Sequence, residues 1–266
     1  MARFIGNIYS AALRMTTQLT VILPEASEDV TPEFFGEPKV LYLLHGLSGN
    51  SLEWARFSKI EYYAKKYNFI IIMPEVQRSF YMDGYYGAKY FTFVADELPE
   101  ICKRWFNITT LREKTFIAGE SMGGYGAVKI GLKRPEKFAG VGTLSGVLDF
   151  KRFIEDSLKG NIQGLFPFEV EALLGPNGLL PESEDTIELV RKTVKLEDRP
   201  RLIQICGTED FLYEDNLKFR EAAYSSGYGH TYMEWKGEHA WPFWDVAIQR
   251  VFQYFCGLDV KKSPIY

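Results

Sequence analysis

A serine, a carboxylate and a histidine that lie far apart in this chain are the residues best suited to chemistry. Ser121 is the centre of a Gly-x-Ser-x-Gly motif, Gly119–Gly123, which follows a short apolar run and precedes a segment of helical periodicity. A strand that passes directly into a helix forces a sharp turn, and the residue at its apex points out of the sheet. We therefore predict that Ser121 is a nucleophile. Because the motif alone is weak, the prediction depends on the strand before it and the helix after it.

A serine hydroxyl needs a base beside it, and the chain has three histidines. His230 stands at the entrance of a predicted strand, and His45 lies in a tight His-Gly turn. His239 follows the predicted strand 231–235 in a short loop, which places it at the carboxyl edge of a parallel sheet with Ser121. We expect His239 to be the base; the alternative is a surface histidine with no catalytic role.

The base in turn needs a carboxylate that fixes its tautomer and stabilises its charged form. Asp210 lies in the loop after the predicted strand 201–206, and its neighbour Glu209 should point the other way. Asp149 follows the preceding strand, and its loop can also reach the histidine. We expect Asp210 to be the acid and retain Asp149 as the competitor, with a turn or helix cap as the other explanation for each.

Two backbone N–H groups should stabilise the oxyanion that forms in acyl transfer. One is that of Met122, at the start of the helix that follows the serine, where the helix dipole assists. The other is that of Leu47, in the loop after the predicted strand 39–44, where Gly46 lets the chain turn. The alternative for this loop is a plain strand-ending turn.

These residues need a scaffold, and the hydrophobic pattern predicts one. Apolar runs indicate strands at 3–13, 15–23, 39–44, 69–73, 115–118, 138–144, 201–206 and 231–235. Helical patterns cover 57–67, 93–106, the segment from 122 onward, 216–225 and 242–256. The alternation predicts an α/β fold with a mostly parallel central sheet and helices on both faces. We expect a loop at 25–38 and a single domain, 1–266, with a small cap-like insertion carrying short helices at about 149–198.

Composition excludes several other functions. The net charge of −4 without a basic stripe argues against a nucleic-acid partner. No segment approaches the length of a membrane span, and the first residues hold no apolar stretch of signal-peptide length. The three cysteines lack the spacing of metal ligands and suit reduced thiols in a cytoplasmic protein. We therefore expect no metal, no cofactor and no membrane partner; a homo-oligomer stays open.

Five motifs together resemble one family: HGLSGN (45–50), ADELP (95–99), GESMGGYGA (119–127), CGTEDFLYEDN (206–216) and GEHAWPFWD (237–245). The chain resembles the esterase D branch of the α/β-hydrolases, most of all the small bacterial tributyrin-type carboxylesterases. The order nucleophile, acid, base along the chain is that of α/β-hydrolases. The resemblance implies an α/β-hydrolase fold, a triad of Ser121, Asp210 and His239, and oxyanion donors at Leu47 and Met122. The insertion at 149–198 matches no part of the family pattern.

The resulting prediction is a serine carboxylesterase that hydrolyses short-chain acyl esters, acetyl to butyryl, through an acyl-enzyme intermediate. Its partner would be a small-molecule ester, with an acylated carbohydrate as one candidate. Alternatives on the same triad are an S-formylglutathione hydrolase-like thioesterase, an acetylxylan or feruloyl esterase, and an acyltransferase; an intact triad argues against a non-catalytic binding module. Bulky side chains beside the catalytic loops should form a small, shallow acyl pocket: Trp54, Phe211, Leu212 and Trp241.

Overall fold

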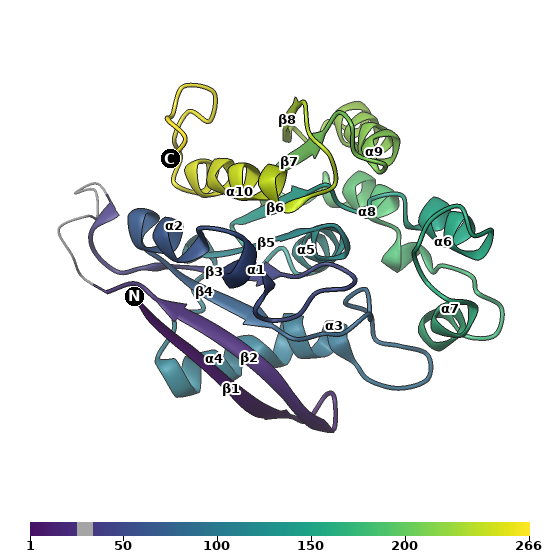
Figure 1. The fold of residues 1–266 in the computed structure, drawn as a ribbon, viewed down its shortest axis with the longest axis horizontal. Coiled ribbons are helices and arrows are strands. Elements are labelled where there is room, and N and C mark those ends of the chain that lie inside the picture. The colour runs from purple at the N-terminus through teal and green to yellow at the C-terminus, as the bar shows by residue number, and fades with distance from the viewer. Residues whose placement is uncertain (26–33) are drawn as a thin grey trace.

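The computed structural model describes residues 1–25 and 34–266, and its central feature is one twisted sheet (Figure 1). Within these residues eight strands pair in the order β1-β2-β4-β3-β5-β6-β7-β8. The strands are β1 (Ala2–Ser10), β2 (Met15–Leu23), β3 (Lys39–Leu44), β4 (Phe69–Pro74), β5 (Thr115–Glu120), β6 (Gly140–Leu144), β7 (Arg201–Gly207) and β8 (Thr231–Trp235). Every predicted strand is present. Most of the predicted loop 25–38 lies outside the described residues.

The pairing is parallel from β4 to β8, and only β1 and β2 run antiparallel to their neighbours. The predicted opening antiparallel pair is thus confirmed, with register from Ala2↔Leu23 to Ser10↔Met15. β1 ends at Ser10 and not at Leu13, because the chain turns there: Arg14 has a φ of 55°, and the Leu13 N–H donates to the Ser10 hydroxyl at 3.1 Å.

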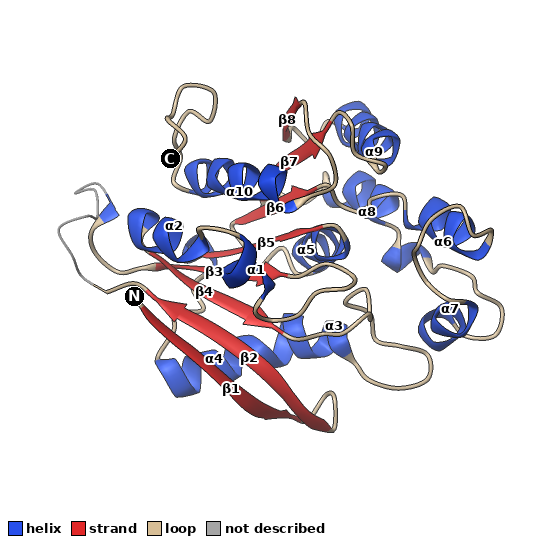
Figure 2. Cartoon of the chain, in the orientation of Figure 1, coloured by secondary structure: helices blue, strands red, loops and turns tan. Residues whose placement is uncertain are grey.

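Thirteen helical segments cover the sheet in the described part of the chain (Figure 2). They are α1 (Glu53–Phe57), α2 (Ile60–Tyr67), α3 (Tyr90–Thr92), the π-helix η2 (Phe93–Glu97), α4 (Leu98–Phe106), the 3₁₀ turn η3 (Arg112–Lys114), α5 (Met122–Lys133), α6 (Phe150–Leu158), α7 (Pro167–Leu174), the 3₁₀ turn η4 (Glu182–Glu184), α8 (Thr186–Thr193), α9 (Tyr213–Ser226) and α10 (Trp241–Phe255).

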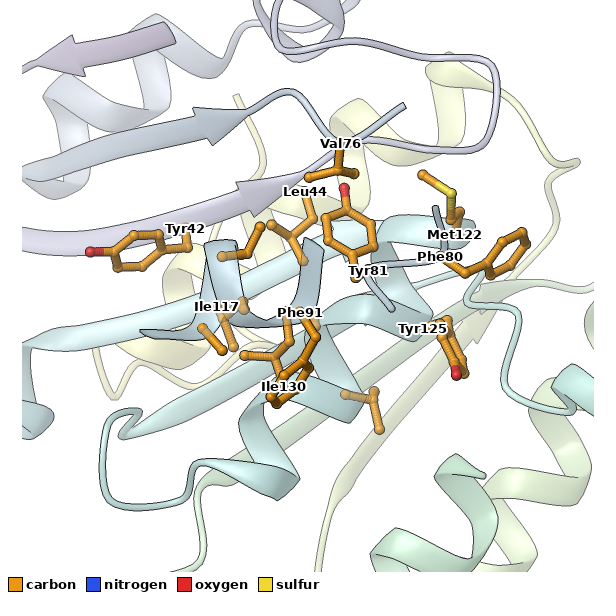
Figure 3. Packing of buried hydrophobic residues seen from close by; sticks show 14 of the residues in the cluster. Tyr42, Leu44, Val76, Phe80, Tyr81, Phe91, Ile117, Met122, Tyr125 and Ile130 are labelled. Carbon is orange, nitrogen blue, oxygen red and sulfur yellow. The ribbon is translucent and has the colours of Figure 1, made fainter. Parts of the chain in front are cut away.

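Both faces of the sheet are apolar, as its parallel pattern requires. Along β3, Val40, Tyr42 and Leu44 enter one core, with side chains from α4, α5, α8 and α9. Leu41 and Leu43 point to the opposite core, which α2 and α10 cover. Figure 3 shows the first core close up, with aromatic rings packed between strand and helix. The predicted α/β architecture with helices on both faces is confirmed.

Two predicted helices are interrupted. The segment predicted at 57–67 begins with the last residue of α1 and continues as α2 only from Ile60. Ser58 between them is extended, and the Asp245 carboxylate accepts from the Lys59 N–H at 2.8 Å. The segment predicted at 93–106 begins as a π-helix. Pro99 has no N–H for the Ala95 carbonyl, which accepts from Lys137 Nζ at 2.8 Å instead.

The stretch 149–198 carries α6, α7, η4 and α8, which are the short helices expected there. In Figure 1, α6 and α7 lie beyond the carboxyl ends of the parallel strands. That is the edge at which sites form in such sheets.

Candidate active site

Ser121 sits between β5 and α5 in a strained turn. Its φ of 54° and ψ of −117° lie outside the regions that a side chain favours, at a cost of about 1–3 kcal/mol. The strain persists because the surroundings hold the turn: the Ser121 N–H donates to the Leu144 carbonyl at 2.9 Å, and α5 packs directly on β3. A Cβ added to Gly123 would lie 2.4 Å from the Leu44 carbonyl oxygen, so only glycine allows this approach.

The structure brings the three predicted residues together. His239 Nε2 lies 3.0 Å from Ser121 Oγ, and His239 Nδ1 lies 2.9 Å from Asp210 Oδ2 and 3.0 Å from Oδ1. Since an ionised carboxylate can only accept, Nδ1 carries the proton and Nε2 is left to accept from the serine hydroxyl. The Asp210 side chain is fully buried, and the Leu212 N–H donates to its Oδ1 at 2.8 Å, which fixes its orientation.

The competing residues lie elsewhere. Asp149 caps α6 and pairs with Lys218. Glu209 is exposed and lies 3.5 Å from Lys236. His230 packs near Phe219, and burial lowers its pKa to about 4. Asp149 therefore has the capping role named as its alternative, and neither Glu209 nor His230 meets Ser121.

The loop after β3 lies beside Ser121. The Gly49 N–H donates to the Gly46 carbonyl at 3.1 Å, which closes a turn around Leu47 and Ser48. Gly46, Leu47 and Ser48 line the same cleft as Ser121. Met122 is the first residue of α5, and the first N–H groups of a helix have no intrahelical acceptor. Both predicted oxyanion donors thus border the serine.

Aromatic rings surround the imidazole of His239. The Phe211 ring centroid lies 4.6 Å away and that of Trp244 lies 4.8 Å away. Trp244 in turn contacts Trp241, and its indole N–H donates to the Ser145 hydroxyl at 3.2 Å. Two aromatic rings thus pack against the imidazole ring.

The cleft over Ser121 has a volume of about 1160 Å³ and is larger than the shallow pocket expected from four bulky residues. Of those four, Phe211 and Trp241 line it. Trp54 and Leu212 are buried behind its wall: Trp54 packs against Trp241 with ring centroids 5.1 Å apart, and Leu212 belongs to the core under the sheet. The cleft is larger than expected because the insertion supplies a second wall. That wall consists of Phe153, Ser157, Gly160, Ile162, Gln163, Gly164, Leu165 and Phe166.

Three charged residues of the cleft were not predicted from the sequence: Glu53, Arg78 and Glu120. Arg78 pairs with Glu169 through both its Nε and its Nη2, the latter at 2.9 Å, and Nη2 also donates to the Gly164 carbonyl at 2.8 Å. Arg78 therefore ties the insertion to the loop after β4. Glu120 lies within the Gly-x-Ser-x-Gly motif. That position was the one signal in the sequence that could have identified it.

Two further properties concern metals and membranes. Across residues 1–25 and 34–266, no cluster of three or more His, Cys, Asp or Glu side chains could hold a metal ion. Within the same residues, every helix is too short or too polar to span a bilayer.

A strained serine after a central strand, hydrogen-bonded to a histidine on the loop after the last strand, is the arrangement of a serine hydrolase with the α/β-hydrolase fold. The sequence profile of the Esterase family, described as "Putative esterase", matches residues 10–255. The chain belongs to this family. It is thus a hydrolase acting on ester bonds, a serine carboxylesterase, as the sequence predicted.

Individual relatives agree with this assignment. An acetyl esterase of Caldicellulosiruptor saccharolyticus is 33% identical over 258 residues, which are 93% of this chain and 96% of the relative. The structure of the fluorophosphonate-binding serine hydrolase FphF of Staphylococcus aureus matches with a TM-score of 0.84 and 32% identity, covering 96% of this chain and 98% of the other. The S-formylglutathione hydrolase FrmB of the same organism matches with a TM-score of 0.81 and 33% identity over the same shares.

Proposed function

We propose that Ser121, His239 and Asp210 form the catalytic triad of an esterase for short acyl chains, which works through an acyl-enzyme intermediate. The observation that carries the proposal is the continuous hydrogen-bonded chain from Asp210 through His239 to Ser121 Oγ, with contacts of 2.9 and 3.0 Å. Ser121 and His239 line the cleft, and Ser121 is on a strained and therefore pre-organised turn.

In the first half-reaction, Ser121 Oγ attacks the ester carbonyl while His239 Nε2 takes its proton. The carbonyl oxygen becomes an oxyanion that accepts from the Leu47 and Met122 N–H groups. His239 then donates its proton to the leaving alcohol, and Asp210 stabilises the imidazolium during this step. In the second half-reaction a water molecule takes the place of the alcohol, and the same groups release the acid.

We extend the proposal to acyl chains of two to about four carbons. The similarity to an acetyl esterase supports this size. So do the Phe211, Trp241 and Trp244 rings, which crowd the base side of the cleft. The wall formed by the insertion leaves room for the alcohol part of the ester, and an acylated carbohydrate is one candidate. The buried thiols of Cys102 and Cys206 are in keeping with action in the cytoplasm.

A p-nitrophenyl ester series tests the chain length, with the Ser121→Ala variant as the background control. Each methylene that fits should add about 0.8 kcal/mol of binding. Once the pocket is full, further carbons cost about 1–3 kcal/mol. We expect maximal kcat/KM between two and about four carbons and a fall of at least about tenfold by eight. Octanoate as the best substrate would contradict the short-chain proposal and leave the triad standing.

A second candidate is hydrolysis of the thioester S-formylglutathione, because FrmB matches the chain over nearly its whole length. The same triad can act on either bond. Direct comparison of kcat/KM for S-formylglutathione and for p-nitrophenyl acetate decides between them. A thioester value more than about tenfold higher would make the thioester the preferred substrate.

A further inference from the structure

One carboxyl group near the nucleophile has no part in the triad. Glu120, the residue before Ser121, is almost fully buried, with a relative exposure of 2%, yet it borders the cleft. Its Oε1 has no hydrogen-bond partner among the described residues. Burying a carboxyl group without a cation beside it lowers the stability of the fold. Its presence beside Ser121 therefore points to a functional role.

The group that Glu120 contacts is the oxyanion loop. Its carboxyl group lies next to the Gly46 backbone. The approach is so close that a Cβ on Gly46 would lie 2.5 Å from Oε2 and 2.7 Å from Oε1. Glu120 therefore supports this loop from below, on the side of the sheet.

The other side of the same loop is held by His45. The Val76 N–H donates to His45 Nε2 at 3.1 Å, so Nε2 is unprotonated, and Nδ1–H donates to the Gly46 carbonyl at 2.8 Å. The Tyr81 hydroxyl donates to the His45 carbonyl at 2.9 Å; Figure 3 shows Tyr81 beside Val76 and Leu44. In a trans peptide, C=O and N–H point in opposite directions. Fixing the Gly46 carbonyl thus fixes the direction of the Leu47 N–H.

We propose that Glu120 is a positioning residue of the oxyanion hole, which holds Gly46 against His45 and thereby fixes the direction of the Leu47 N–H. The inference rests on the proposed function, since it assigns Leu47 as an oxyanion donor. A negative charge on Glu120 would stand next to the oxyanion and oppose its formation. A neutral acid holds the loop without that repulsion.

The surroundings favour the neutral form. Burial and the nearby Glu53 carboxylate on α1 raise the pKa of Glu120 well above its usual value of 4.5. From the loop after β4, the neighbouring titratable group is Tyr81, whose own pKa burial and Glu120 raise. From β3 it is His45, whose pKa burial lowers and which is therefore neutral. None of these groups supplies a positive charge.

The first test compares Glu120→Gln with Glu120→Leu. The glutamine imitates the neutral acid and should keep kcat within about threefold of wild type at neutral pH. The leucine removes the acceptor and should lower kcat by about 10- to 100-fold with KM little changed, because one oxyanion donor is misplaced. Affinity for an alkyl trifluoromethyl ketone, which forms a tetrahedral adduct with the serine, should fall in parallel with kcat. Glu113→Gln, on the exposed approach to β5, is the matched control.

The second test uses pH. Since the folded pKa of Glu120 is raised, the folded chain binds more protons than the unfolded chain once pH exceeds about 4.5, and wild-type stability falls as pH rises towards the folded pKa. The melting temperature of Glu120→Gln relative to wild type should therefore increase from pH 5 to pH 9, whereas that of Glu113→Gln should not.

Two results would overturn the inference: a Glu120→Gln variant as impaired as Glu120→Leu, or a Glu120→Leu variant with wild-type kcat. If the leucine variant does not fold, shown by the loss of a cooperative thermal unfolding transition, the glutamine variant and its pH trend still decide. Failure of the proposed function itself is distinct, because it would appear as turnover that survives Ser121→Ala.

Discussion

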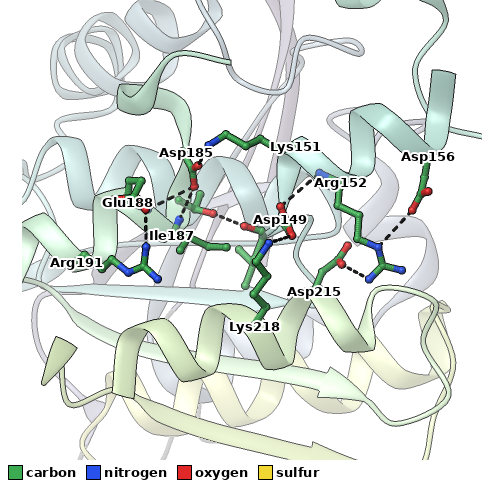
Figure 4. Close-up of polar contacts among 12 residues, drawn as sticks. Asp149, Lys151, Arg152, Asp156, Asp185, Ile187, Glu188, Arg191, Asp215 and Lys218 are labelled. Atoms are coloured by element: carbon green, nitrogen blue, oxygen red, sulfur yellow. Dashed lines mark hydrogen bonds and ion pairs between the residues drawn. The ribbon is translucent and has the colours of Figure 1, made fainter. Parts of the chain in front are cut away.

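The two walls of the cleft are built differently. The wall that carries Ser121, Met122 and Leu47 is held by the sheet, by main-chain hydrogen bonds and by glycine contacts that no larger residue permits. The opposite wall, contributed by the insertion 149–198, packs apolar side chains such as Phe153 and Leu165 into the core and is also tied by ion pairs between side chains. Figure 4 shows several of them: Lys151–Asp185 at 2.8 Å, Arg152–Asp215 at 2.6 Å and Lys218–Asp149.

The difference separates chemistry from selection of the substrate. Main-chain contacts leave little freedom for substitution, so the geometry of the nucleophile is rigid. Partly exposed ion pairs contribute only about 0–1 kcal/mol each, so the residues of these pairs can vary at low cost to stability. Changes in the first wall should alter kcat, whereas changes in the second should alter KM and the choice of ester.

The largest effect is expected at the nucleophile. Ser121→Ala should lower kcat by about 10³- to 10⁶-fold, because the oxyanion hole and substrate binding remain without covalent catalysis. Stability should change little, since the hydroxyl is not part of the core. Steady-state kinetics with p-nitrophenyl acetate measures the loss, and near-normal activity would remove the proposed mechanism.

Next comes the acid. Asp210→Asn should lower kcat by about 10²- to 10⁴-fold, because the amide favours the wrong tautomer of His239. Asp149→Asn is the matched control: it should affect the cap of α6 and leave turnover nearly unchanged. A reversal of the two results would mean that the acid is Asp149.

The insertion has one buried ion pair, and it should carry a large effect on stability. Lys129 on α5 is fully buried, with its Nζ 2.9 Å from Glu184 Oε2 and 3.0 Å from the Phe80 carbonyl oxygen. Glu184→Gln leaves this lysine without its counter-charge and should destabilise the fold by about 3–5 kcal/mol in urea unfolding.

The Lys129→Met variant and the Lys129→Met/Glu184→Gln double variant complete a double-mutant cycle for this pair. A double variant as unstable as Glu184→Gln would mean that the unpaired buried charge is not the cause of the destabilisation.

The pH dependence of stability gives a separate check. Burial lowers the pKa of Lys129 from 10.5 to about 8, so the unfolded chain binds more protons between those values. Wild-type stability relative to Lys129→Met should therefore rise with pH across that window.

The smallest effect is expected at the partly exposed pair of Arg78 and Glu169. Arg78→Gln should release the Gly164 carbonyl and loosen the insertion wall, which we expect to raise KM for esters of bulky alcohols by about two- to fivefold. KM for p-nitrophenyl acetate should change less. Glu169→Gln should imitate the effect, and an equal loss for small and bulky esters would contradict the division between the two walls.

The local sequence pattern predicted most of the secondary structure of this molecule. Every strand and the elbow at Ser121 followed from apolar runs and a glycine motif, because those signals lie within a few residues of one another. The interruptions in the helices did not. The break at Ser58 depends on Asp245, and the Ala95 carbonyl that Pro99 leaves free finds its donor in Lys137; both partners are distant in the chain.

The same division applies to the site. The amino-acid sequence by itself determined which residues stand at the carboxyl edge of the sheet, because strand order and direction fix that edge. Only the tertiary structure decided that Asp210 and not Asp149 meets His239, that Trp54 and Leu212 lie behind the cleft, and that Glu120 lies under Gly46. These outcomes depend on side-chain directions and on contacts between distant segments, which no local pattern encodes.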